Sequence, residues 1–152
     1  NPDLNLAIIG ADNHQEFLQR IDRSIRHRVV VLPKMSFVKL PELLSAADII
    51  AIPQRRTSDS VGQIPARLFD AMSMGKPIIA TRMSDIPEVL DGCGYLVDPN
   101  QPAQLAEAIE YILNHLDEAR AKGQTARERC QRMYDISNLE FGLSKLVEKV
   151  LA

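Results

Sequence analysis

Arg67 and Asp70 are the two residues of this chain whose types and spacing are best suited to chemistry. Residues three apart lie on the same face of a helix, so their guanidinium and carboxylate would stand side by side in a helical segment. The N-terminus of a helix attracts anions, because its first N–H groups are free and the positive end of its dipole lies there. At such a site the cation could hold a phosphate and the carboxylate a sugar hydroxyl. The plainer alternative is an exposed ion pair, which would contribute little to stability.

Two prolines and a glycine mark the bounds of the helix that would carry these residues. Pro65 suits the first helical position, where its missing N–H would have no partner in any case. Gly75 suits the left-handed residue just past the end of a helix. Pro77 prevents the helix from continuing. We therefore predict a helix over Ile64–Met74, with the cation and the carboxylate near its start.

Five short apolar runs are continuous rather than alternating, which is typical of strands buried on both faces of a parallel sheet. They are Leu6–Ile9, Val29–Leu32, Ile49–Ile52, Ile78–Ala80 and Tyr95–Val97. The patterns between them are helical, over His14–Arg26, Pro41–Ala46, Ile64–Met74 and Ile86–Leu90. This alternation predicts an α/β fold with a doubly wound, Rossmann-like parallel sheet over residues 1–100.

The last third of the chain is expected to be a helical tail, over residues 101–152. Its helical patterns run over Pro102–Leu116, Glu118–Tyr134 and Asn138–Leu151. A chain of 152 residues suits one domain, so we expect residues 1–152 to form a single lobe.

Composition excludes several classes of function. The net charge of −2 gives no basic field for nucleic acid. Cys93 and Cys130 form neither a disulfide framework nor a metal-ligand spacing, and a reduced, cytoplasmic setting is the default for such a chain. Neither a signal peptide nor an apolar run long enough to span a membrane is visible. No Ser/His/Asp or Cys/His constellation is apparent.

The segment Pro65–Thr81 resembles the donor-binding motif of the retaining, group 1 (family 4) glycosyltransferases of GT-B fold. That family writes Pro-x-Lys-Leu-x-Glu-Ala/Tyr-Met-Ala-x-Gly-x-Pro-Val-Ile-Ala-Thr, and this chain has Pro-Ala-Arg-Leu-Phe-Asp-Ala-Met-Ser-Met-Gly-Lys-Pro-Ile-Ile-Ala-Thr. Further segments match in register between Asn5 and Ile112. They are Leu6–Gly10, Val29–Pro33, Leu43–Pro53, Asp85–Val89 and Gly94–Pro99.

The resemblance implies a nucleotide-sugar-binding, C-terminal lobe and assigns its residues. Arg67 replaces the usual lysine and would neutralise the donor diphosphate, which an arginine can bind bidentately. Asp70 replaces the glutamate that hydrogen-bonds the ribose hydroxyls. Gly62 replaces a glutamate that often touches the donor sugar, and with Gln63 it lies in a loop that could offer backbone N–H groups. Gly10 ends the first strand, at the edge where ligands of α/β sheets gather, although a tight turn alone would also require glycine.

The resemblance also implies parts that this sequence lacks. These are the first strand of the lobe, with a Gly-Arg…Lys-Gly segment, and an N-terminal lobe that holds the acceptor. We therefore expect sugar transfer with retention from a nucleoside diphosphate sugar to an acceptor sugar or lipid that the absent lobe holds. We expect neither metal nor other cofactor and no nucleic acid partner. Any peripheral membrane association would occur through the absent regions, and the isolated chain should not transfer sugar.

The absent first strand also gives a prediction of sheet order. In the family that strand lies at the centre of the order 3-2-1-4-5-6. Without it, direct pairing of Leu6–Ile9 with Ile49–Ile52 would satisfy their buried backbone groups and give the order 2-1-3-4-5.

Two other functions are compatible with the sequence. One is a non-catalytic nucleotide-binding or scaffold module that reuses the lobe, which the departures at Gly62 and Asp70 favour. The other is a related GT-B epimerase or a flavodoxin-like regulator, although the acidic cluster of such regulators is absent.

Overall fold

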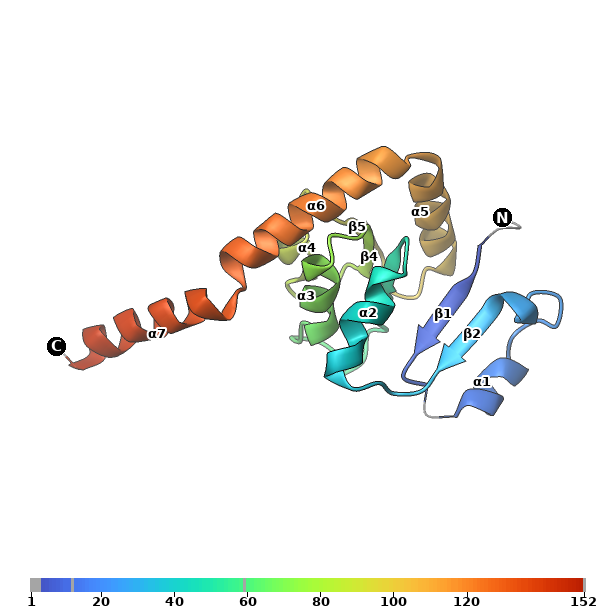
Figure 1. The fold of residues 1–152 in the computed structure, drawn as a ribbon, viewed down its shortest axis with the longest axis horizontal. Helices are drawn as coiled ribbons and strands as arrows, with labels where there is room; N and C mark the ends of the chain where they lie inside the picture. The colour runs from blue at the N-terminus through green and yellow to red at the C-terminus, as the bar shows by residue number, and fades with distance from the viewer. Residues whose placement is uncertain (1–3, 12, 59, 152) are drawn as a thin grey trace. The chain divides into compact units, whose positions relative to one another are not determined.

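The computed structural model describes residues 4–11, 13–58 and 60–151 (Figure 1). Contacts within the chain divide it into two compact units, Asn1–Leu43 and Leu44–Ala152, which we call the first and the second unit. Helix α2 (Leu40–Ser45) runs across the boundary between them. Among the described residues, no helix is both long enough and apolar enough to cross a membrane.

The first unit contains two strands that lie where the sequence predicts them. β1 (Leu6–Ile9) pairs in parallel with β2 (Val29–Leu32), with Leu6 opposite Val29. Helix α1 (His14–Gln19) packs on β2, and two 3₁₀ turns complete the unit. These turns are Arg26–Arg28 and Phe37–Lys39.

Helix α1 is shorter than the predicted helix over His14–Arg26. Asn13 caps its start, because the Asn13 side chain accepts a hydrogen bond from the Glu16 N–H at 3.2 Å. Beyond Gln19, the carboxylate of Asp22 accepts hydrogen bonds from the N–H and the hydroxyl of Ser24, both at 2.8 Å. Such local bonds compete with the helical pattern, so the apolar spacing that favours a longer helix is overridden by a turn.

The prediction that all the strands are buried on both faces was wrong for β1 and β2. Leu6 is 50% exposed and Val30 is 54% exposed, and Val31 is the buried residue of this pair of strands. A two-stranded sheet flanked by one short helix cannot cover both of its faces.

The second unit contains the parallel, three-stranded sheet β3-β4-β5. Its strands are β3 (Ile50–Ile52), β4 (Ile78–Thr81) and β5 (Tyr95–Val97). Its helices are α3 (Ala66–Ser73), α4 (Ile86–Val89), α5 (Pro102–Asn114), α6 (Leu116–Met133) and α7 (Ile136–Leu151). All four residues of the central strand β4 are buried, as its continuous apolar run predicts. The prediction failed in part for its neighbours, because Ala51 of β3 is exposed and Tyr95 and Leu96 of β5 are half-buried.

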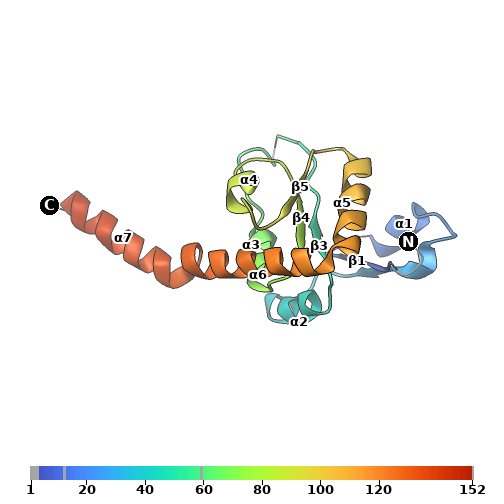
Figure 2. The ribbon, with the colours of Figure 1, turned by 90° about the horizontal axis from the view of Figure 1, so that it is seen from above.

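Helices α5 and α6 close the core of the second unit. Ile79 of β4 and Val97 of β5 form a buried cluster with Ile112 of α5 and Ala119 of α6. Full burial of a large apolar side chain contributes about 1.5–3 kcal/mol, so this cluster fixes both helices on the sheet. Helix α6 also runs across α3 in both views (Figures 1 and 2). The parallel sheets, their flanking helices and the terminal helices confirm the predicted α/β class with a helical tail.

The predicted strand order 2-1-3-4-5 was wrong. β1 pairs with β2 and β3 pairs with β4, but no ladder joins β1 to β3 among the described residues. The prediction required β1 and β3 to lie in one sheet, whereas the two strands belong to different sheets and to different units of the chain. Water can satisfy the backbone groups of an exposed edge, so nothing forces the two strands to pair directly.

Candidate functional site

Helix α3 carries the pair of residues that the sequence singles out. It begins at Ala66, with Pro65 as an extended N-cap residue (φ −67°, ψ 130°) rather than the predicted first helical position. Its end is as predicted, because Gly75 takes a left-handed φ of 64° directly after the C-cap residue Met74. The buried face of α3 consists of Leu68, Ala71 and Met72. Arg67 and Asp70 lie off this face, so they remain accessible.

Arg67 lies in the first turn of α3, where a cation is electrostatically unfavourable. The positive end of the helix dipole lies there, and the turn contains no acidic residue. Arg67 is exposed and makes no ion pair within 4 Å with any residue that the structure describes. The N–H groups of Ala66 and Arg67 also have no intrahelical acceptor. An anion bound here would compensate all of these positive groups.

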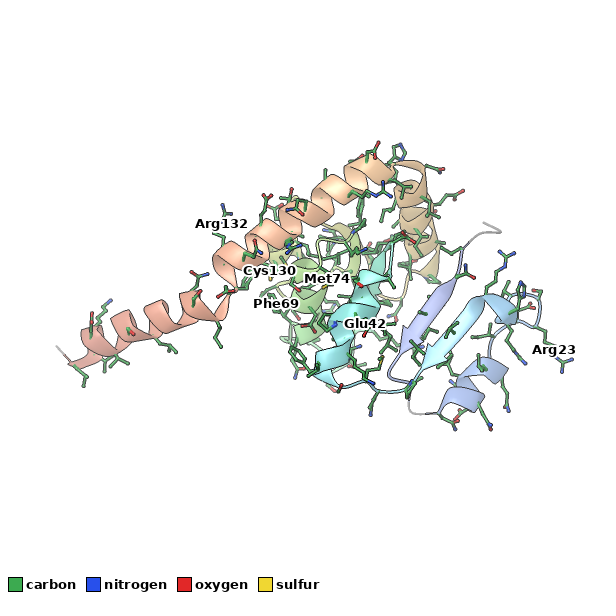
Figure 3. The ribbon with its side chains drawn as sticks, in the orientation of Figure 1. Arg23, Glu42, Phe69, Met74, Cys130 and Arg132 are labelled. Atoms are coloured by element: carbon green, nitrogen blue, oxygen red, sulfur yellow. The ribbon has the colours of Figure 1, made fainter. Side chains whose placement is uncertain are left out.

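Asp70 is partly buried, and burial raises the pKa of its carboxyl, while the positive charge of Arg67 partly opposes the rise. The negative charge of Asp70 on α3 also helps to raise the pKa of the Cys130 thiol on α6. Figure 3 labels Cys130 and Phe69 where α6 meets α3. There the thiol donates a hydrogen bond to the Phe69 carbonyl oxygen at 3.7 Å, and the Phe69 ring lies 4.9 Å from that of Tyr134.

The loop between β3 and α3 is held at both ends by hydroxyl groups that follow or end β4. At its start, the Gln54 N–H donates to the Thr81 hydroxyl at 3.0 Å. At its end, the Gly62 N–H donates to the Ser84 hydroxyl at 2.9 Å. In between, the Ser60 hydroxyl donates to the Arg55 carbonyl oxygen at 2.7 Å. Both of these outer contacts therefore come from β4 and the residues that follow it, and the predicted phosphate donor at Gly62 is already engaged.

A hollow of about 340 Å³ lies beside this loop, at the carboxyl ends of β4 and β5. It is lined by Arg56, Val61, Gly62, Arg82, Met83, Ser84, Asp98 and Pro99. Arg82 forms an ion pair with Asp98 across 3.5 Å, whereas Arg56 makes none with a described residue. The two arginines in its mixed polar and apolar lining, and its position at this edge of a parallel sheet, suit a ligand.

The structure places four of the five predicted site residues in the second unit. Gly62, Gln63, Arg67 and Asp70 are contiguous with the end of the loop and the start of α3, and Gly62 lines the hollow. Gly10 belongs to the first unit. It has a φ of 85°, and its N–H donates to the Leu32 carbonyl oxygen at 3.0 Å, so the turn after β1 requires glycine.

Sequence reasoning missed Thr81 and Ser84. Thr81 is 3% exposed, and a buried hydroxyl at the end of an apolar strand signals a hydrogen-bond partner. Ser84 gives no such signal, because its left-handed φ of 46° and its bond to a residue 22 positions away are not encoded locally. Within the described ranges, no group of three or more His, Cys, Asp or Glu residues is arranged to hold a metal ion.

Comparison with known proteins assigns this architecture to a family. The family model described as "Glycosyl transferases group 1" matches residues 1–115. The D-inositol 3-phosphate glycosyltransferase of Corynebacterium diphtheriae is 32% identical over 124 residues, which cover 75% of this chain and 28% of that protein. A GDP-mannose-dependent phosphatidylinositol monomannoside mannosyltransferase of Corynebacterium glutamicum is 26% identical over 129 residues, covering 83% of this chain and 34% of that protein.

Solved structures share the fold. The Anabaena HepE complex with UDP-glucose has a TM-score of 0.78 at 18% identity, over 98% of this chain and 42% of that one. The sucrose-phosphate synthase of Thermosynechococcus elongatus has a TM-score of 0.79 at 23% identity, over 97% of this chain and 38% of that one. The chain thus spans less than half the length of these proteins. With a family match over most of its length and the fold of these structures, the chain belongs to the group 1 glycosyltransferases.

Proposed function

We propose that this chain is the donor-binding part of a retaining glycosyltransferase, which transfers a sugar from a nucleoside diphosphate sugar to an acceptor. The observation that carries the proposal is Arg67, an exposed cation in the first turn of α3 without an ion-pair partner among the described residues. Such an arrangement costs stability in the absence of an anion, and it suits the diphosphate of the donor.

The chemistry follows from where negative charge develops. When the bond between sugar and diphosphate breaks, the leaving nucleoside diphosphate gains charge, and groups already aimed at it lower the barrier. Arg67 and the free N–H groups of α3 would supply that stabilisation without a metal ion. Asp70, one turn further along, would accept hydrogen bonds from the ribose hydroxyls.

The matched proteins support this choice of ligand. The Corynebacterium glutamicum relative is named as dependent on GDP-mannose, and the Anabaena neighbour was crystallised with UDP-glucose. These two proteins use different nucleotides, so the base that this chain binds must be determined by experiment. Because the matched proteins are more than twice as long, we propose that the acceptor is held by a part that this chain does not include. The isolated chain should accordingly bind a donor without transferring its sugar.

Calorimetric titration of the chain with UDP, GDP and ADP tests the proposal. We expect one nucleotide to bind, with an affinity that EDTA leaves unchanged. Arg67→Ala should weaken binding of both that nucleotide and inorganic pyrophosphate about tenfold, the loss expected for a charge-assisted contact. Asp70→Asn should weaken the nucleotide alone, because pyrophosphate has no ribose.

Arg132→Ala is the matched control, since Arg132 is an exposed arginine in the last turn of α6 (Figure 3). Equal affinities in Arg67→Ala and in the unaltered chain would reject the site. The alternative is a non-catalytic module, which makes the same binding prediction if it is nucleotide-binding and predicts no binding if it is a scaffold. It is distinguished by whether the full-length protein that contains this chain turns over a nucleotide sugar.

A further inference from the structure

Two hydroxyl groups, three residues apart along the chain, fasten both ends of the loop that leads into α3. Thr81 accepts the Gln54 N–H at 3.0 Å, and Ser84 accepts the Gly62 N–H at 2.9 Å. The Ser84 hydroxyl also lies 3.5 Å from the Ser60 carbonyl oxygen. We call these two bonds the hydroxyl clamp. Because Thr81 ends the buried central strand β4, the clamp ties the loop to the end of this strand and to the residues that follow it.

Ser84 holds its position at a conformational cost. Among the described residues other than glycine, Ser84 and Asn100 are those with a positive φ. Asparagine tolerates this region, whereas serine enters it less readily. The surrounding structure therefore over-determines the conformation of Ser84, and such residues concentrate at functional positions. The Ser84 hydroxyl accepts the hydrogen bond of the Gly62 N–H, and both residues line the hollow.

We propose that Ser84 is a positioning residue for the nucleotide-sugar donor. Its hydroxyl fixes Gly62, and only three residues separate Gly62 from the start of α3, where Arg67 lies in the first turn. The bond thus fixes the point from which the loop runs into the N-terminal end of α3, beside the hollow that Ser84 and Gly62 line. This inference rests on the proposed function, because the loop matters only if a donor binds there.

Amide hydrogen exchange at Gly62, measured by NMR, reports on the clamp without any nucleotide. Ser84→Ala and Ser84→Gly both remove the acceptor, and both should raise the Gly62 exchange rate about tenfold, as for loss of one hydrogen bond. Thr81→Val is the matched control, since it removes the other hydroxyl at nearly constant volume. It should accelerate exchange at Gln54 and leave Gly62 unchanged.

Titration with the nucleotide that the unaltered chain binds supplies the functional readout. We expect Ser84→Ala and Ser84→Gly to weaken binding about fivefold to tenfold, and Ser84→Asn to restore part of the loss, because asparagine tolerates a positive φ and offers an oxygen acceptor. If Ser84→Gly bound as tightly as the unaltered chain, relief of backbone strain rather than the hydroxyl would explain the effect, and the proposal would be wrong.

The two readouts separate the failure of this inference from that of the proposed function. An unaltered chain that binds no nucleotide overturns the proposed function and, with it, the donor role of Ser84, whereas Gly62 exchange still shows whether the clamp exists. A chain that binds nucleotide equally well in all Ser84 variants overturns the positioning role alone.

Discussion

Gly123 of α6 lies directly against the backbone of Gly75, the residue that follows the C-cap of α3. A Cβ atom at position 123 would lie 2.5 Å from the Gly75 carbonyl oxygen, and 2.8 Å from that of Lys76. No side chain can yield at this contact, because both neighbouring atoms belong to the backbone. The close approach of α6 to the end of α3 therefore depends on glycine.

Gly123→Ala should lower the free energy of unfolding by about 1–3 kcal/mol, as overpacking does, even though alanine favours helices more than glycine. Chemical denaturation measures the loss. Thr125→Ala, at an exposed position two residues further along α6, should change stability by less than about 0.5 kcal/mol. A Gly123→Ala variant more stable than the parent would show that α6 leaves room for a methyl group at this contact.

Arg129 ties α6 to the end of α4. Its guanidinium donates to the Glu88 carbonyl oxygen at 2.9 Å and to the Asp91 carbonyl oxygen at 3.0 Å. Arg129→Ala should cost about 2 kcal/mol of stability, and Arg129→Lys part of that, because lysine cannot span both oxygens. Arg120→Ala, which loses only a 3.9 Å exposed ion pair, should have little effect in the same denaturation assay.

The ionised carboxylate of Asp70 should lower the stability of the fold while it strengthens nucleotide binding. Burial raises its pKa in the folded state, so the folded chain holds the proton more tightly than the unfolded chain. The ionised carboxylate therefore opposes folding above the folded pKa, and this cost disappears as the pH falls through that pKa toward the ordinary value of 3.8.

Asp70→Asn should thus raise the melting temperature slightly at pH 7, by about 1 °C for a partly screened group, and the gain should vanish near pH 4. The same variant should bind nucleotide less tightly. Thermal melts at the two pH values check the first part. A lower melting temperature at pH 7 would mean that the carboxylate makes a stabilising contact instead.

Cys130 should be a slow nucleophile at neutral pH. Burial raises its pKa most, and the charges of Asp135 and Asp70 raise it further. In iodoacetamide alkylation followed by mass spectrometry, Asp70→Asn should shift the rate profile to lower pH while leaving the limiting rate at high pH unchanged. A higher limiting rate would instead indicate greater exposure of the thiol. Cys93, which is fully buried, should remain unmodified in both proteins.

Local sequence patterns were sufficient for the elements of the second unit. The apolar run of β4 reflects burial on both faces, and the glycine after α3 reflects a positive φ. Both features depend on residues that are close together in the sequence, so a local pattern predicts them. The same reasoning failed for α1, because Asp22 and Ser24 form a turn that the apolar spacing does not reveal.

Features that depend on distant partners could not be predicted. The two bonds of the hydroxyl clamp join residues that lie 27 and 22 positions apart in the sequence. Neither Gln54 nor Ser84 belongs to a motif that predicts its bond. The division of the strands into two sheets likewise depends on pairing between distant segments, and no local pattern encodes that. The roles of Gly62, Gln63, Arg67 and Asp70, and that of Gly10, stay predictions until a nucleotide is titrated.

Among the described residues, β2 and β5 each pair with a neighbouring strand on one side only, and this has a practical consequence for titrations. An unpaired strand edge is a template on which another copy can add its own strand. We therefore expect self-association that grows with concentration, visible as a rising apparent mass in light scattering. Titrations at two protein concentrations would keep such adhesion between copies from being mistaken for weak or incomplete ligand binding.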